Sequence, residues 1–381
     1  MYMYTPSSLF IGLMLIIVMI TQSKQINPDD PGKSTAHLLG DEPCVPFEYW
    51  ATSLISFRLC LGKSEEEVRA GRTVTAMIRS RGFQPMCRGF HLLMWMMETV
   101  VPLSSNGYFL DTNPYIGGCV FHMAALGYKV IAAEKYEGFV DTMMGTMAMN
   151  PAFHHEVEIH HAALGTAHEN KRVKFWHAGS GNNVNTGYDD AEADDPDGVN
   201  LEVVPFPSLV QERQVTLAAL ACVTSCNMGD ILKTIPQIKL QTLPMIYLEV
   251  HFRYTKTTTE IHDILHILHH NDYIILPFIY PEYEYYYGRR SQEPEEVDKL
   301  FGSKVFGIPY SEDLIVETAK KFLNTKIDHD TLSEAFNREF HGVVAMTRSL
   351  YEKMVQHFLP DAEPSNYNRH LFGENFTLSS V

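Results

Sequence analysis

Two acidic residues stand at the ends of consecutive apolar runs, where side chains can reach a bound ligand. Asp111 ends the run 108–111, and Glu134 ends the run 129–134 about 20 residues later. If both runs are parallel strands, their carboxylates lie at the same edge of one sheet, which is where ligands of open α/β sheets bind. A second acid at this spacing is typical of nucleoside sites, where it accepts hydrogen bonds from ribose hydroxyls. The pair therefore predicts a ligand that contains a nucleoside.

The turn after Asp111 indicates which nucleoside this is. The turn contains Gly117 and Gly118 but lacks the G-x-G-x-x-G pattern that cradles a phosphate, and Asp111 itself would repel a pyrophosphate. An acid beside a glycine backbone instead favours a cofactor that carries a positive sulfonium and a zwitterionic amino acid. S-adenosylmethionine has this character, and we predict it as the cofactor.

Strands and helices alternate along the chain from residue 107 onwards. Helices are predicted over 119–126 and 136–149, and Gly127 is expected to end the first of them in a left-handed conformation. Further strands are predicted over 157–164, 215–223, 245–250 and 273–278, the last being the final strand of the sheet. Such alternation produces parallel βαβ units, so we expect an α/β fold with a Rossmann-like, doubly wound, mostly parallel sheet.

This stretch resembles the FkbM-type S-adenosylmethionine-dependent methyltransferases, as a divergent member. The family's first motif is approximately D-x-G-A-N-x-G, and the chain has D-T-N-P-Y-I-G over 111–117. The family's next strand ends in V-x-A-F-E-P, and the chain has V-I-A-A-E-K over 130–135. Asn150, the A-L-G of 163–165 and a late strand over 246–251 follow in the family's order, so that the resemblance extends over residues 105–280.

The resemblance implies a role for each matched residue. The methionine end of S-adenosylmethionine would lie by Asp111, Asn113, Ile116 and Gly117, the ribose by Glu134, and the adenine by Ala162 and Ala163. Glu249 and His251 are the candidates for taking a proton from the methyl acceptor. For the acids, helix capping, exposure at strand ends and other structural roles remain open.

The chain also departs from the family pattern. Asn113 replaces a glycine, Pro114 an alanine and Tyr115 an asparagine; Asn113 can adopt the left-handed backbone that the glycine provides, whereas Tyr115 can fill part of the cofactor cleft. After the predicted strand 215–223, the family's D-x-E-G-x-E is missing, and Asp230 is the nearest carboxylate. These losses motivate the alternative that the chain is a catalytically silent binding protein with a methyltransferase fold.

The function expected from the resemblance is methylation of a hydroxyl oxygen on a glycan or another small hydroxylated acceptor. A second alternative, a lumenal glycosyltransferase, rests on an acidic run over 189–197 in a loop predicted at 179–200 between antiparallel strands at 172–176 and 201–205. That run contains Asp194 and Asp195, which resemble a cation-binding Asp-x-Asp, although a solvated surface loop is the favoured interpretation because no strand end fixes these carboxylates.

The termini suggest where the protein works. Residues 1–23 are uncharged and mostly apolar, which predicts a cleaved signal peptide or an N-terminal membrane anchor, followed by a linker over 24–44. A helical cap over 45–104 and a mainly helical extension over 281–381 are expected to flank the methyltransferase-like domain of 105–280. The protein is therefore expected to be secreted, lumenal, or anchored by one span with a lumenal domain.

Charge and cysteine content narrow the partners further. The net charge of −16 excludes a nucleic-acid partner, because no basic block offsets the repulsion of a phosphate backbone. The six cysteines form an even set, as expected of disulfides in an oxidising compartment, but the sequence leaves their pairing open. Four histidines on the polar side of a predicted helix over 258–270 have spacing that can bind a metal, but no third ligand is evident, and no metal site is predicted.

Overall fold

The computed structural model describes just under three fifths of the chain, and the segments predicted at 1–23 and 24–44 lie almost wholly outside it. The described ranges are 44–50, 54–60, 83–101, 107–178, 185–211, 213–222, 228–250, 258–278, 305–306, 312–324 and 342–361. Within these ranges, no helix is both long enough and apolar enough to cross a membrane.

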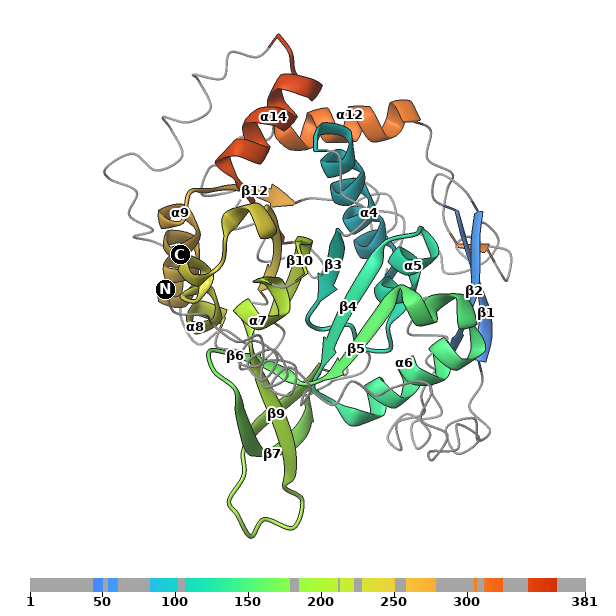
Figure 1. Ribbon diagram of the computed structural model, residues 1–381, viewed down its shortest axis with the longest axis vertical. Coiled ribbons are helices and arrows are strands. Elements are labelled where there is room, and N and C mark those ends of the chain that lie inside the picture. The colour runs from blue at the N-terminus through green and yellow to red at the C-terminus, as the bar shows by residue number, and fades with distance from the viewer. Residues whose placement is uncertain are drawn as a thin grey trace, which may run out of the picture.

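A seven-stranded sheet forms the centre of the molecule (Figure 1). In spatial order its strands are β12 (Tyr273–Phe278), β14 (Gly342–Thr347), β11 (Met245–Val250), β10 (Val215–Cys222), β3 (Tyr108–Asp111), β4 (Lys129–Glu134) and β5 (Val157–His161). All neighbours pair in parallel except β14, which is antiparallel to both β11 and β12. The order changes direction between β3 and β10, which is the switch point where ligands of such sheets bind. The predicted fold class is confirmed.

Helices cover both faces of this sheet, because its strands are apolar on both sides. One face packs against α4 (Phe83–Val100), α5 (Gly118–Ala125), α6 (Glu137–Met149), α12 (Glu312–Leu323) and α14 (Arg348–Phe358). The other face packs against α7 (Phe206–Gln211), α8 (Met228–Leu232) and α9 (Thr258–His270). Odd-numbered residues of β3 and β11, such as Phe109 and Tyr247, point to the first face. Their even-numbered neighbours point to the second.

The C-terminal part of the chain, which the sequence predicts to be mainly helical, contains α12 and α14 but also adds a strand to the main sheet. Residues 342–347 form β14, which inserts between β11 and β12, so β12 is not the last strand and the sheet does not end at residue 280. The segment G-V-V-A-M-T is short, β-branched and buried throughout, which suits a central strand. The sequence does not predict this strand, because a short run that is apolar at every position has neither the two-residue period of a strand nor the 3.6-residue period of a helix.

The first part of the predicted helical cap is also wrong. Residues 44–50 and 54–60 form an antiparallel pair, β1 (Cys44–Trp50) and β2 (Leu54–Cys60), and β13 (Val305–Phe306) adds to β1 in parallel. Over residues 45–49 of β1, Val45, Phe47 and Tyr49 alternate with Pro46 and Glu48, and this two-residue period is that of a strand. The second part of the cap is helical as predicted, since α4 spans 83–100.

A side chain of α6's C-terminal end holds β2 in place. The amide of Asn150 accepts a hydrogen bond from the Arg58 backbone N–H at 2.9 Å and donates one to the Arg58 carbonyl at 2.7 Å, as a neighbouring strand would. The Cys60 N–H donates to the Thr146 hydroxyl at 2.9 Å. The small sheet of β1, β2 and β13 is thus attached to the helix layer by side chains that mimic strand pairing.

Replacing Asn150 with alanine is expected to lower the free energy of unfolding by about 1–2 kcal/mol, because both bonds to Arg58 are lost. Urea denaturation measures the change. Asn170, an exposed residue of β7 (Glu169–Ala178), is the matched control, and its replacement with alanine should change stability by less than about 0.5 kcal/mol. An unchanged midpoint for Asn150→Ala would show that the amide pairing does not hold β2.

A second, four-stranded sheet lies between β5 and β10 in the sequence and extends away from the main sheet (Figure 1). Its order is β6 (Ala163–Gly165), β9 (Val199–Pro205), β7 and β8 (Asn185–Asp190). The antiparallel pairing of β7 with β9 is as predicted. The loop predicted at 179–200 is wrong in part, because residues 185–190 pair with β7 as β8 and carry Asp189 and Asp190.

Candidate functional site

Three buried carboxylates lie at the carboxyl ends of main-sheet strands and on one face of the sheet. Asp111 ends β3, Glu134 ends β4 and Glu249 is the second-last residue of β11, and their side chains are 7, 2 and 4% exposed. On each strand the residue two positions earlier, Phe109, Ala132 or Tyr247, lies in the core beneath α4 and α5. Because residues two apart on a strand point to the same face, all three acids point to that side. Buried acids cost free energy unless they are compensated. Their gathering at the switch point therefore marks a candidate binding site.

Asp111 is compensated only in part by its surroundings. Its Oδ1 accepts a hydrogen bond from the Asn113 backbone N–H at 3.1 Å. Burial raises the pKa of Asp111 to about 7, and the charges of Glu134 and Glu249 add to this rise, while the bond from Asn113 opposes it. A cationic group placed beside Asp111 would relieve both the burial cost and the repulsion.

Glu134 holds the turn after β3 against the start of α6. Its Oε2 accepts a bond from the Tyr115 N–H at 3.1 Å and its Oε1 one from the Tyr136 N–H at 2.9 Å. Burial raises the pKa of Glu134, although the charge of Lys135 and these backbone bonds oppose the rise. Each carboxylate oxygen has two lone pairs, so both oxygens retain the capacity to accept a further bond from a ligand hydroxyl.

The turn between Asp111 and α5 takes its left-handed residues at positions 115 and 117. Tyr115 has φ of 59° and Gly117 has φ of 84°, whereas Asn113 does not have a positive φ. The expectation that Asn113 supplies the left-handed conformation is therefore wrong. At Gly117 a side chain is also excluded by space, since a Cβ would lie 2.6 Å from the Phe121 ring.

The Tyr115 backbone hydrogen-bonds Glu134, and the Tyr115 ring packs at a tilt against Phe139 of α6. The ring centroids of Tyr115 and Phe139 are 4.1 Å apart, and Tyr136 meets Phe139 edge-on at 4.9 Å. The half-buried Tyr115 side chain thus packs against α6 rather than pointing away into solvent. Its N–H bond to Glu134 is one reason why that carboxylate is only 2% exposed.

The other predicted site residues are placed at different distances from the acids. The Ala162 N–H donates to the Glu134 carbonyl at 2.9 Å, which brings Ala162 next to the end of β4. Ala163 instead begins β6 and packs in the core of the second sheet, and Ile116 is buried in the core beneath α4. His251 lies outside the described residues.

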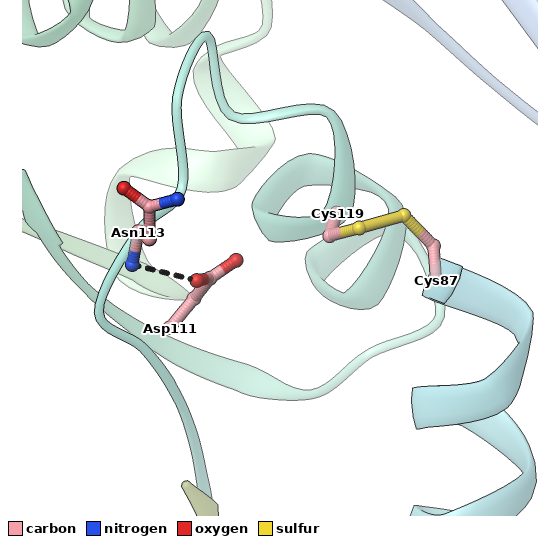
Figure 2. Close-up of a disulfide and its surroundings, with 4 residues drawn as sticks. All are labelled: Cys87, Asp111, Asn113 and Cys119. Atoms are coloured by element: carbon pink, nitrogen blue, oxygen red, sulfur yellow. Dashed lines mark hydrogen bonds between the residues drawn. A yellow bond between two sulfur atoms is a disulfide. The ribbon is translucent and has the colours of Figure 1, made fainter. Parts of the chain in front are cut away.

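A disulfide joins the glycine turn to α4. Cys119, in the first turn of α5 just after Gly117, is bonded to Cys87 of α4 (Figure 2). In the same view the Asp111 carboxylate lies beneath the turn and accepts a hydrogen bond from the backbone N–H of Asn113. Cys60 is disulfide-bonded as well, and Cys44 stands directly opposite it in the β1–β2 register. The pairing of Cys87 with Cys119 is not predictable from the sequence, because the two residues meet only when α4 packs against α5.

Replacing both Cys87 and Cys119 with alanine is expected to lower the free energy of unfolding by about 3.5–4 kcal/mol, because the bond closes a loop over a separation of 32 residues. Urea denaturation of the two oxidised proteins measures the difference. A variant with the wild-type midpoint would show that the crosslink does not restrict the unfolded chain as this estimate assumes.

Neither of the sequence's other polar clusters forms a metal site in the described part of the chain. In the acidic run, Lys174 contacts Asp195 at 3.5 Å and Asp197 at 3.0 Å, and Arg172 donates to the Asp195 carbonyl at 2.7 Å. On α9, the rings of His266 and His270 meet edge-on at 4.3 Å. Across the described ranges, no three His, Cys, Asp or Glu side chains are grouped so that they could hold a metal ion. The acidic run is a surface turn closed by basic side chains.

The chain matches no protein-family model and no curated protein. Among solved structures it is similar to the methyltransferase FkbM from Methylobacillus flagellatus, with 13% identity, a TM-score of 0.32 and coverage of 45% of this chain and 40% of that one. It is also similar to the Haemonchus contortus phosphoethanolamine N-methyltransferase 2 in complex with S-adenosyl-L-methionine, with 11% identity, a TM-score of 0.35 and coverage of 77% and 62%. The likeness concerns the fold, a Rossmann-like sheet of the kind that methyltransferases use, and the chain spans about two fifths of the FkbM structure.

Proposed function

We propose that the chain is an S-adenosylmethionine-dependent methyltransferase of the FkbM type that methylates a hydroxyl oxygen of a glycan or another small acceptor. The observation that carries this proposal is the pair Asp111 and Glu134, buried on one face at the carboxyl ends of adjacent parallel strands and separated by the Gly117 turn. Paired strand ends of this kind hold the nucleoside of a Rossmann-like site.

The buried carboxylates suit this cofactor in their charge and in their capacity to accept hydrogen bonds. When bound, S-adenosylmethionine supplies an electrophilic methyl group on a positive sulfonium. Three buried carboxylates without a phosphate cradle favour such a cation over an anionic nucleotide. Glu134 has lone pairs for the ribose hydroxyls, and Asp111 faces the cationic methionine end.

The protein's own part in the reaction is to bind, to orient and to hold a proton. Transfer requires the acceptor oxygen to lie in line with the methyl group, and the protein achieves this by positioning. The hydroxyl proton must then leave the acceptor oxygen, and we assign it to Glu249, the buried carboxylate at the end of β11. His251, two residues further along, is the second candidate from the sequence.

We also propose that the protein acts in the secretory pathway. The apolar residues 1–23 support entry into that pathway, through a cleaved signal or a membrane anchor. The Cys87–Cys119 disulfide supports it independently, because such bonds persist in oxidising compartments.

One observation favours a second candidate function, that of a catalytically silent binding protein. Glu134 is 2% exposed, and both its oxygens accept backbone bonds, one from Tyr115, which replaces the family's asparagine. If this arrangement is rigid, the ribose cannot approach Glu134. The two candidates share a fold and differ in whether methyl transfer occurs.

Methyl transfer from tritium-labelled S-adenosylmethionine separates the two candidates. The full chain, produced through a secretory pathway so that its disulfides form, is incubated with neutral glycans and small alcohols. We expect label in at least one acceptor with the wild type and none with Glu134→Gln. Cofactor binding without transfer to any acceptor fraction would favour the silent protein, and absence of cofactor binding would contradict the proposed methyltransferase.

A further inference from the structure

The hydroxyl of Tyr247 is buried in β11 without a hydrogen-bond partner in the part of the chain that the structure describes. Tyr247 is 1% exposed, and its ring meets Phe90 edge-on at 5.1 Å and Phe278 at 5.7 Å. A buried hydroxyl without a partner costs free energy that a phenylalanine at the same place would avoid. Such groups in native proteins call for an explanation, and a ligand that supplies the missing partner is one.

The Tyr247 ring is directed towards the carboxyl end of its strand. The pairing of Leu248 with Val343 places Gly342 opposite Glu249 at that end. A Cβ built on Gly342 would lie 3.1 Å from Cε2 of Tyr247, which is a ring atom next to the hydroxyl-bearing carbon. The hydroxyl side of the ring therefore leans towards the carboxyl end of β11, where Glu249 lies, and over Gly342 of β14, as strand side chains commonly lean along the strand.

Tyr247 and Glu249 lie on the far side of the switch point from the ribose-binding acid. Across the sheet the strands follow one another as β4, β3, β10 and β11, which places Glu134 first, Asp111 second and the β11 pair last. The register aligns Asp111 with Ala219, and Ala219 with Tyr247, so that Asp111 and Tyr247 stand at the same height. With the ribose at Glu134 and the methionine end at Asp111, the next position along this row belongs to the methyl acceptor.

We infer that Tyr247 and Glu249 form the acceptor subsite, in which the phenol hydroxyl binds the acceptor directly and the subsite takes an uncharged hydroxylated compound. This inference rests on the proposed function and deepens it.

The chemistry of the surrounding residues sets the acceptor class. Asp111, Glu134 and Glu249 are buried together, so an acceptor that carries a carboxylate or phosphate would add a further anion to a negatively charged site. The phenol of Tyr247 can donate to, or accept from, an acceptor hydroxyl. The Phe90 and Phe278 rings, which both meet the Tyr247 ring edge-on, make the surroundings of that phenol apolar, which suits the C–H groups of a sugar ring or an alkyl chain.

The experiment compares two tyrosines of the same sheet. Tyr273 of β12 is also buried, but its hydroxyl donates to the Leu243 carbonyl at 2.8 Å, so Tyr273→Phe is the matched control for Tyr247→Phe. The full chain is loaded with S-adenosylhomocysteine and titrated with methyl β-D-glucoside and with methyl β-D-glucuronide, which differ by one carboxylate. Ligand-observed NMR gives the dissociation constants, and urea denaturation of the unliganded proteins gives the midpoints.

The subsite predicts that the neutral glucoside binds to the loaded wild type and that the glucuronide binds at least tenfold more weakly. Tyr247→Phe should weaken glucoside binding about fivefold to tenfold, leave the affinity for S-adenosylhomocysteine unchanged, and keep or raise the urea midpoint. Tyr273→Phe should lower the midpoint and leave both affinities unchanged.

Three results would overturn the inference while S-adenosylhomocysteine still binds: no binding of the glucoside, equal or tighter binding of the glucuronide, or unchanged glucoside affinity in Tyr247→Phe. Failure of S-adenosylhomocysteine to bind the wild type would instead contradict the proposed function, and the acceptor subsite with it.

Discussion

Replacing Asp111 with asparagine is expected to stabilise the unliganded chain at pH 7.5 and to weaken its binding of S-adenosylmethionine about 100-fold. Burial raises the pKa of Asp111 from 3.8 to about 7, so the folded chain keeps a proton between these values that the unfolded chain has lost. The stability of the unliganded chain therefore falls as the pH rises from about 4 to 7, by roughly 4 kcal/mol for this group. The asparagine side chain does not titrate, so the stability of the variant does not decrease with pH through this position.

Cofactor binding should respond to pH in the opposite direction. A cationic ligand favours the ionised form of Asp111, so the affinity for S-adenosylmethionine should rise about tenfold per pH unit up to pH 7 and then level off. In Asp111→Asn the affinity should be low and nearly independent of pH. The change is distinctive because the same substitution stabilises the free protein and weakens the complex.

Urea denaturation and calorimetric titration between pH 5 and 7.5 measure both effects. Because the pKa of Glu134 is also raised, a smaller slope of stability with pH should persist in Asp111→Asn. Asp230→Asn, which removes an exposed carboxylate paired with Lys233, is the control and should change neither curve. An unliganded wild type that becomes more stable from pH 5 to 7.5, or an affinity that falls over this range, would contradict the assigned role of Asp111.

Replacing Glu134 with glutamine is expected to weaken S-adenosylmethionine binding at least about 100-fold, because charged hydrogen bonds to the ribose are each worth about 1.5–3 kcal/mol. Glutamine keeps the size of the side chain but replaces one acceptor oxygen with an N–H₂ donor. That donor would face the N–H of either Tyr115 or Tyr136, and a loss of about 1–3 kcal/mol in stability should follow.

Glu137 provides the matched control for Glu134. It is exposed in the first turn of α6, three residues further along, so Glu137→Gln should leave cofactor affinity unchanged and stability within about 0.5 kcal/mol of the wild type. Calorimetric titration and urea denaturation of the two variants separate the local role of Glu134 from a general effect of lost charge. Equal affinities in Glu134→Gln and Glu137→Gln would show that Glu134 does not bind the ribose.

The part of the fold that local pattern determines was predictable from the sequence. Strands β3 and β4 end at Asp111 and Glu134 as expected, α9 spans 258–270 as expected, and Gly127 has the left-handed φ of 92° that ends α5. In each case a short-range signal, such as a buried run, an amphipathic period or a glycine stop, agrees with the tertiary structure.

Features that depend on distant contacts were not predictable. The apolar segment 342–347 becomes a strand because it pairs with β11 on one side and with β12 on the other. The residues within the segment do not predict these two neighbours. In the sequence, Asn150 stands out only through the resemblance to the FkbM type, whereas in the structure its amide hydrogen-bonds the edge of β2 at Arg58, 92 residues away. Tyr247 looked like an ordinary strand residue, and only the absence of a partner among the described residues distinguishes its hydroxyl.

The candidate site was predictable in its acids but not in its turn. Asp111 and Glu134 could be named from spacing, because parallel strands bring their ends to one edge. The conformation of the turn between them could not, since the left-handed backbone falls on Tyr115, a residue type that rarely adopts it, rather than on Asn113. The bond from Tyr115 to Glu134 and the disulfide behind the turn hold that conformation in place.

Equilibrium binding of S-adenosylmethionine to the full, oxidised chain tests the central claim most directly. Calorimetric titration at pH 7.5 should give one site per chain with a dissociation constant in the micromolar range, on the order of −8 kcal/mol, and S-adenosylhomocysteine should compete for it. Absence of binding at cofactor concentrations up to about 1 mM, which corresponds to roughly −4 kcal/mol, would contradict the claim that Asp111 and Glu134 form a cofactor site.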